Sequence, residues 1–146
     1  MIKKLGSVLI ACLISSGALA CEPCSSILTL EQTATKADTI VIGEPASSDD
    51  ALSTSRPEYI HVKVQRALKG KQVDKVIKVR SWYGICPFGI QFSRNEKALI
   101  FLSKENDHYK SVDDGCAERQ VPIINGVISI QDKKMAVDEF LQHYLK

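Results

Sequence analysis

The feature that narrows the possible folds furthest is a pair of cysteines, Cys21 and Cys24, directly behind what reads as an export leader. Residues 1–4 form a short start with the basic residues Lys3 and Lys4, residues 5–14 are mostly apolar, and Ala18-Leu19-Ala20 matches the small-x-small pattern of a signal-peptidase site. The apolar run is shorter than a helix that spans a bilayer. The sequence therefore predicts a signal peptide over residues 1–20 and a single mature domain over residues 21–146 that begins with cysteine.

The number of cysteines predicts disulfide bonds. Cys12 leaves with the leader, and the mature chain keeps Cys21, Cys24, Cys86 and Cys116. An even set in an exported protein favours two disulfides. Three pairings of four cysteines are possible, and at this point they all stay open.

A lipid anchor on Cys21 is an alternative, because this cysteine stands where a bacterial lipoprotein carries its lipid. Two observations count against it. Such signals usually place leucine three residues before the cysteine, whereas Leu19 lies two before it. Lipidation would also leave an odd cysteine without a partner. We therefore expect a protein that is exported to the periplasm or secreted, with lipid anchoring as the minority interpretation.

Charge and length limit the classes of function. The leader contains two basic residues, Lys3 and Lys4, so the mature chain has 17 basic and 17 acidic side chains. A net charge of zero provides no general attraction to nucleic acid or to an anionic membrane. The length fits one domain with one core. No later segment resembles a transmembrane span, and a monomer is expected.

The pattern of apolar residues predicts mainly strands. A short helix over residues 30–37 begins at a capping box formed by Thr29 and Gln32. Strands follow at 39–43, 59–68, 75–82 and 97–102, with Ile77 and Val79 facing inward, and a short edge strand at 108–112. Asn125-Gly126 between apolar runs predicts a hairpin over residues 121–130.

The chain ends with an amphipathic stripe that predicts a helix capped by Asp132. Val137, Phe140, Leu141 and Tyr144 recur at helical spacing, and we expect them to pack on the sheet. Five or six short strands with a helix near each end predict a mainly β, OB-fold-like barrel that is closed or nearly closed.

Several segments follow one another in a particular order. They are the N-terminal cysteine pair, a helix leading to the run 37–43, a strand ending at 66–70, Cys86-Pro87-Phe88 ahead of the run 96–102, and the isolated Cys116. Their order resembles the netrin-like domain, the inhibitory domain of tissue inhibitors of metalloproteinases, and in particular its short bacterial members. The resemblance runs from Cys21 to about Cys116. It implies an OB-type barrel with flanking helices, and bridges from Cys21 to Cys86 and from Cys24 to Cys116. A direct bridge between Cys21 and Cys24 is the main alternative.

The resemblance also implies a function. In the animal inhibitors, the amine and carbonyl of the first cysteine bind the catalytic zinc of the partner enzyme. A neutral terminal amine is a good zinc ligand, and catalytic zinc keeps an open coordination position. Cys21 would then bind the zinc of the partner, and Cys21, Glu22, Pro23 and Cys24 would form the ridge that fills its substrate cleft. The animal proteins have Cys-x-Cys, so the extra residue and the charge of Glu22 change this ridge.

Two other functions remain open. The first is a non-inhibitory envelope module, for which the polar loop at residues 47–56 and the segment 82–85 are candidate contact surfaces. The second is a thiol oxidoreductase that uses Cys21 and Cys24, although no strand can precede Cys21 once the leader is cut. The sequence shows no catalytic motif and no cofactor motif. The three histidines, His61, His108 and His143, are scattered and expected at the surface.

Overall fold

A computed structural model describes residues 24–51, 57–81, 89–130 and 132–145. Its elements, in chain order, are α1 (Leu30–Lys36), β1 (Thr39–Pro45), the 3-10 helix η1 (Ser48–Asp50), β2 (Tyr59–Lys69), β3 (Val76–Arg80), β4 (Ala98–Glu105), β5 (His108–Ser111), the 3-10 helix η2 (Val112–Gly115), β6 (Gln120–Ile124), β7 (Val127–Ile130), β8 (Lys133–Ala136) and α2 (Val137–Tyr144).

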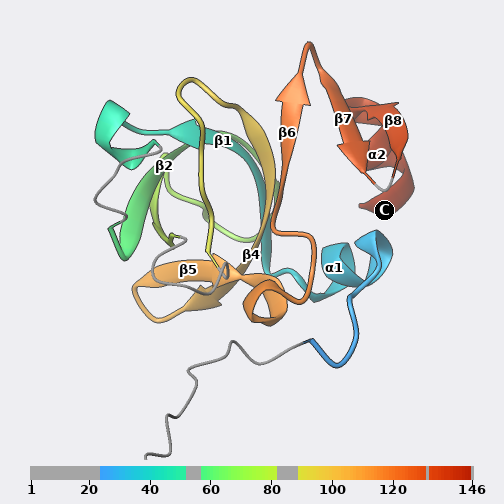
Figure 1. Ribbon diagram of the computed structural model, residues 1–146, viewed down its shortest axis with the longest axis horizontal. Coiled ribbons are helices and arrows are strands. Elements are labelled where there is room, and N and C mark those ends of the chain that lie inside the picture. Colours follow the sequence, from blue (N-terminus) through green and yellow to red (C-terminus); the bar gives the residue numbers. More distant parts are fainter. Residues whose placement is uncertain (1–23, 52–56, 82–88, 131, 146) are drawn as a thin grey trace, which may run out of the picture.

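Five of the strands close into a barrel (Figure 1). The strand order is β1-β2-β3-β5-β4, and β4 returns to pair with β1. All of these pairings are antiparallel except β3 with β5, which is parallel. This mainly β barrel with two helices confirms the predicted OB-fold-like class.

The apolar side chains form two separate clusters on the two sides of the barrel wall. The barrel interior holds Val41, Val62, Val79, Phe92 and Ile100 among others. A second cluster lies outside the wall and includes residues from α1, β1, β4, β7 and α2. Because strand residues alternate between faces, β1 and β4 contribute to both clusters. This two-sided burial explains why the run Ala98–Leu102 is apolar throughout and fully buried.

The long strand β2 is bent by two irregularities in its pairing with β1. Ile42 pairs with Arg66 and Gly43 pairs with Val64, so Gln65 has no partner residue on β1. An extra residue of this kind bends a strand and changes the direction of the side chains that follow it. A Cβ atom at Gly43 would lie 2.6 Å from Cγ1 of Val62, so the close approach of the two strands there requires glycine.

Beyond the barrel, β6, β7 and β8 form a small antiparallel extension of the sheet, and α2 packs beside it (Figure 1). The predicted turn is confirmed, because Asn125 and Gly126 connect β6 to β7 with φ values of 52° and 76°. Positive φ at both positions is what a tight two-residue hairpin turn needs. We refer to β6, β7, β8 and α2 together as the cover.

The predicted helix start was wrong. Residues 133–136 form β8, which pairs with β7 from Val127↔Ala136 to Ile130↔Lys133, and α2 begins only at Val137. Asp132 lies in the turn before β8 with φ 65° and does not cap a helix. Backbone pairing with the neighbouring hairpin strand outweighs helix propensity here. The apolar stripe itself is confirmed, because Val137 and Phe140 are buried against the outer cluster.

The expectation of an edge strand at residues 108–112 was also wrong. β5 lies between β4 and β3 and completes the barrel. Its short length suggested an edge, but its parallel pairing to β3 depends on a contact between Val79 and Tyr109 that no local pattern reveals. The inward positions predicted for β3 are confirmed, since Ile77 and Val79 are buried in the barrel interior.

Candidate functional site

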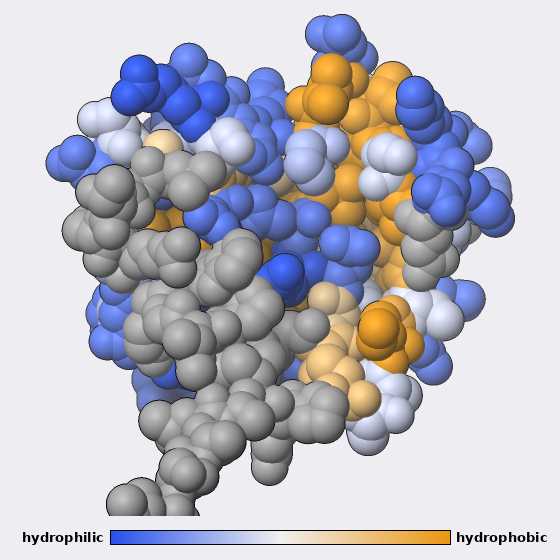
Figure 2. Space-filling model, in the orientation of Figure 1, coloured by the Kyte–Doolittle hydropathy of each residue, from blue (hydrophilic) through white to orange (hydrophobic). Residues whose placement is uncertain are grey.

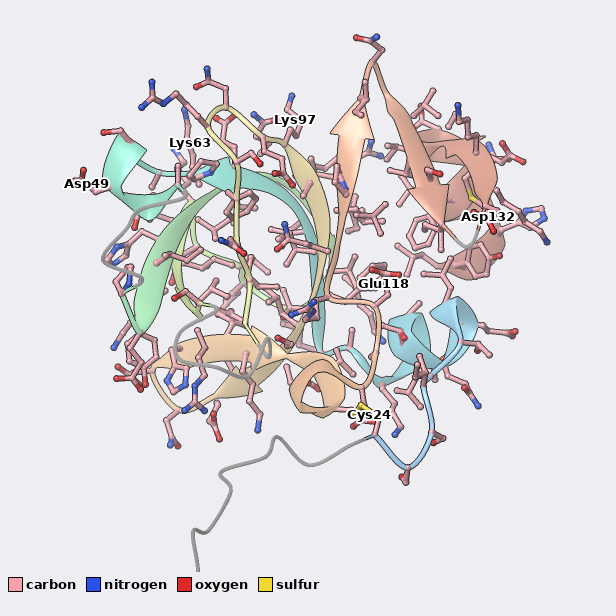
Figure 3. All side chains as sticks on the ribbon, viewed as in Figure 1. Cys24, Asp49, Lys63, Lys97, Glu118 and Asp132 are labelled. Carbon is pink, nitrogen blue, oxygen red and sulfur yellow. A yellow bond between two sulfur atoms is a disulfide. The ribbon has the colours of Figure 1, made fainter. Side chains whose placement is uncertain are left out.

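The point where the N-terminal segment meets the barrel is the candidate site that the cysteines indicate (Figure 3). A disulfide joins Cys24 to Cys116, with their Cα atoms 5.5 Å apart. This is the pairing that the netrin-like resemblance implies. Because the sulfur of Cys24 is bonded to Cys116, it does not form a bridge with Cys21.

A second link reinforces this attachment. The backbone N–H of Leu28 donates to the carbonyl of Cys116 at 3.0 Å. Cys116 is the C-cap residue of η2, and its N–H donates to the carbonyl of Asp113. Residues 24–28 therefore follow the barrel surface between a covalent bond and a hydrogen bond to the same residue. Ile27 lies between the two links and is 78% exposed, an apolar side chain open to contact.

Helix α1 continues this fixed segment. Thr29 Oγ1 accepts from the N–H of Gln32, and the Gln32 side chain accepts from the N–H of Thr29, so the predicted capping box is confirmed. At the other end of the helix, Lys69 Nζ donates to the carbonyls of Ala34 and Thr35 at 2.9 Å each. These carbonyls have no partner within the helix, and a cation is favourable at this end.

An ion pair connects α1 to η2. Lys36 Nζ lies 2.7 Å from Asp113 Oδ2, and both side chains are partly exposed. An exposed pair of this kind adds little stability, about 0–1 kcal/mol. It does bring η2, which precedes Cys116, next to the helix that follows Cys24.

Glu118 is a half-buried carboxyl group two residues after the bridge. Burial raises the pKa of Glu118, because it disfavours the charged form, while the neighbouring Arg119 acts in the opposite direction. Figure 3 shows Glu118 between η2 and the cover, in the loop that leads from the disulfide to β6. The region around the bridge therefore contains a carboxyl group that is neutral more readily than usual.

Several predicted site residues lie outside the described part of the chain. They are Cys21, Glu22, Pro23 and Cys86, with the bridge from Cys21 to Cys86, the zinc-binding role of Cys21 and the segment 82–85. All of these stay predictions.

The structure describes residues 47–51 of the polar loop predicted at 47–56. In this part, Asp50 accepts hydrogen bonds from the N–H of His61 at 2.7 Å and from Ser47 Oγ at 2.7 Å.

His108 corrects the expectation that all three histidines lie at the surface. It is buried, with its ring edge-on to Tyr59 at 4.9 Å between centroids. Nδ1 lies 3.1 Å from Asp107 Oδ1, and Nε2 lies 3.3 Å from Glu105 Oε2 without hydrogen-bond geometry. The hydrogen bond from His108, followed by the contact with Lys78, lowers the pKa of Asp107 to about 2. These contacts link β2, β3 and β5 at one end of the barrel.

Sequence reasoning missed Lys36, Asp113, Lys69 and Glu118. Lys36 and Asp113 are 77 positions apart, and no local pattern connects them.

In the described ranges, no three His, Cys, Asp or Glu side chains come together as metal ligands would. Comparisons of the chain with protein-family models, curated proteins and solved structures found no match. None of the helices in the described ranges has the length and apolar character needed to cross a membrane.

Proposed function

We propose that this protein is an exported, non-enzymatic netrin-like module that binds a partner protein through its N-terminal segment, and that it inhibits a zinc metalloproteinase with the free amine of Cys21. The observation that carries the proposal is the double attachment of residues 24–28 to Cys116, by a disulfide and by the hydrogen bond from Leu28. Cys24, the last residue of the proposed ridge, is thereby attached to the barrel surface. An attachment made before binding reduces the conformational entropy that is lost on binding.

Three further observations support this function. A disulfide that joins distant parts of the chain is typical of proteins from oxidising compartments, which fits export. With Cys24 bonded to Cys116, Cys21 and Cys24 are not a dithiol pair, which argues against thiol exchange. Ile27 offers an exposed apolar contact beside the bridge.

The first experiment is intact-mass measurement and non-reducing peptide mapping of the exported protein. We expect a chain that starts at an unmodified Cys21, with linkages Cys21–Cys86 and Cys24–Cys116. A diacylglycerol mass on Cys21 would remove the free amine and would support the alternative of a lipid-anchored envelope module.

The second experiment tests inhibition directly, with thermolysin and a matrix metalloproteinase catalytic domain as probe enzymes. The matched control is the same protein with one alanine added before Cys21, which keeps every cysteine but moves the amine. We expect the mature protein to inhibit and the extended protein to lose inhibition. Equal inhibition by both forms would contradict zinc binding by the amine, and no inhibition by either would favour a non-inhibitory module.

A further inference from the structure

A groove of about 540 Å³ opens between the barrel wall and the cover. Its apolar floor is formed by Ile42 of β1, Ile123 of β6 and Val137 at the start of α2. Arg66, Lys97 and Asp138 line its polar rim. A recess of this size, with apolar walls and a few charged groups, has the composition of a binding site.

The chain geometry brings Arg66 to this rim. Gln65 is the residue without a pairing partner on β1, and the irregularity turns Arg66 toward the outer side of the wall, across from α2. Arg66 Nη1 lies 3.4 Å from Asp138 Oδ1, with both side chains more than half exposed. Such a pair is weak and exchanges readily for a better carboxylate.

Lys97 supplies the second cation. It precedes β4, and its carbonyl accepts from the N–H of Ile123 at 2.8 Å, which fixes its backbone beside the groove. Within the described ranges, the Lys97 ammonium takes part in no ion pair. The rim therefore offers two cations against the single carboxylate of Asp138.

An exposed apolar pair lies at the tip of the β6–β7 hairpin, on the face opposite to Ile123, because side chains alternate along each strand. Ile124 and Val127 flank the turn and are 69% and 39% exposed. Asn125 and Gly126, which form the turn, line the groove. Figure 2 shows apolar atoms gathered over this hairpin, beneath a polar tip. This pair therefore lies next to the hairpin turn but outside the groove.

We propose that this groove binds a peptide segment of a partner protein in which an acidic residue is next to an apolar residue. The acidic side chain lies between Arg66 and Lys97, and the apolar side chain covers the floor formed by Ile42, Ile123 and Val137. A peptide segment fits because the groove opens to solvent at the hairpin turn, and because its rim carries two cations against one carboxylate. The site goes beyond the proposed function, since Figure 3 shows Lys97 and Cys24 at opposite ends of the molecule.

The probe for a direct test is the peptide acetyl-Ser-Leu-Glu-Ile-Ser-amide, titrated into the isotopically labelled protein. Amide resonances of Lys97, Gly126 and Val137 report on the groove. We expect saturable shifts at these positions and weaker binding of the glutamine version of the peptide. Equal binding of the two peptides, or no shifts at these amides, would overturn the proposal. Binding of octanoate without binding of the glutamate peptide would also overturn it, in favour of a small amphiphile.

Variants separate binding from the structural role of the ion pair. Arg66→Gln and Lys97→Gln should each weaken glutamate-peptide binding about two- to fivefold, the range measured for exposed ion pairs. Asp138→Asn should strengthen it about twofold, because it frees Arg66 and removes a like charge. Lys63→Gln is the matched control, on the same strand as Arg66 and outside the groove, and should change nothing. Equal weakening by Arg66→Gln and Asp138→Asn would show that the pair only supports the fold, and would overturn the proposal.

Discussion

At the scale of single residues, the carboxyl group of Glu118 makes stability depend on pH. Its pKa is raised by burial in the folded protein. The folded state therefore binds this proton more tightly than the unfolded chain does. The stability that this gives is fully present below the ordinary pKa of about 4.5 and is lost as the pH rises through the folded value.

We therefore predict that Glu118→Gln raises the melting temperature at pH 7. The gain should shrink as the pH falls and vanish near pH 4, where the native glutamate is also neutral. Thermal unfolding followed by circular dichroism between pH 4 and pH 8 measures it. Asp74→Asn, at an exposed loop position, is the matched control for the removal of a carboxylate charge. A gain that is the same at every pH would show that charge is not the cause.

At the scale of elements, α1 depends on its first turn more than on its length, because seven residues are too few for a helix that is stable alone. Thr29 and Gln32 satisfy two of its free N–H groups. We predict that Thr29→Ala lowers the free energy of unfolding by about 1 kcal/mol, measured by urea denaturation.

The matched control for Thr29→Ala is Thr35→Ala, an exposed position within the same helix. It should change the free energy of unfolding by only a few tenths of a kcal/mol and is expected to stabilise slightly, since alanine has the higher helix propensity. If the two variants had the same effect, the loss of a side-chain methyl and hydroxyl in α1 would explain both, and the cap would have no special role.

The elements differ in how well the sequence predicts them. α1, β1, β2, β3 and the Asn125-Gly126 turn follow from local patterns, because capping, alternation and positive φ are properties of neighbouring residues. β8 and the place of β5 do not, because each depends on pairing with a partner strand whose position is set by the whole barrel. The groove cannot be predicted from the sequence for the same reason. Arg66 and Asp138, which line it, are 72 positions apart and come into contact only when the cover packs against the barrel wall.

At the scale of the whole molecule, the disulfide between Cys24 and Cys116 connects positions 92 residues apart. Closing a loop of this length restricts the unfolded chain, and typical disulfides stabilise by about 2–4 kcal/mol. We predict that the double variant Cys24→Ser/Cys116→Ser loses stability in this range, measured by urea denaturation without reductant. A loss below about 0.5 kcal/mol would show that the contacts of α1 and η2 alone hold this segment.

The same bond divides the chain into a covalent ring and a tail. The ring contains α1 and all five barrel strands, whereas β6, β7, β8 and α2 follow Cys116 and lie outside it. A backbone cut in the loop between β2 and β3 would leave both fragments joined through the disulfide. A cut between Cys116 and Gln120 would leave the tail held only by noncovalent contacts. A protease that reached both loops would therefore leave the barrel in one covalent piece, with the hairpin and α2 held to it by noncovalent contacts alone.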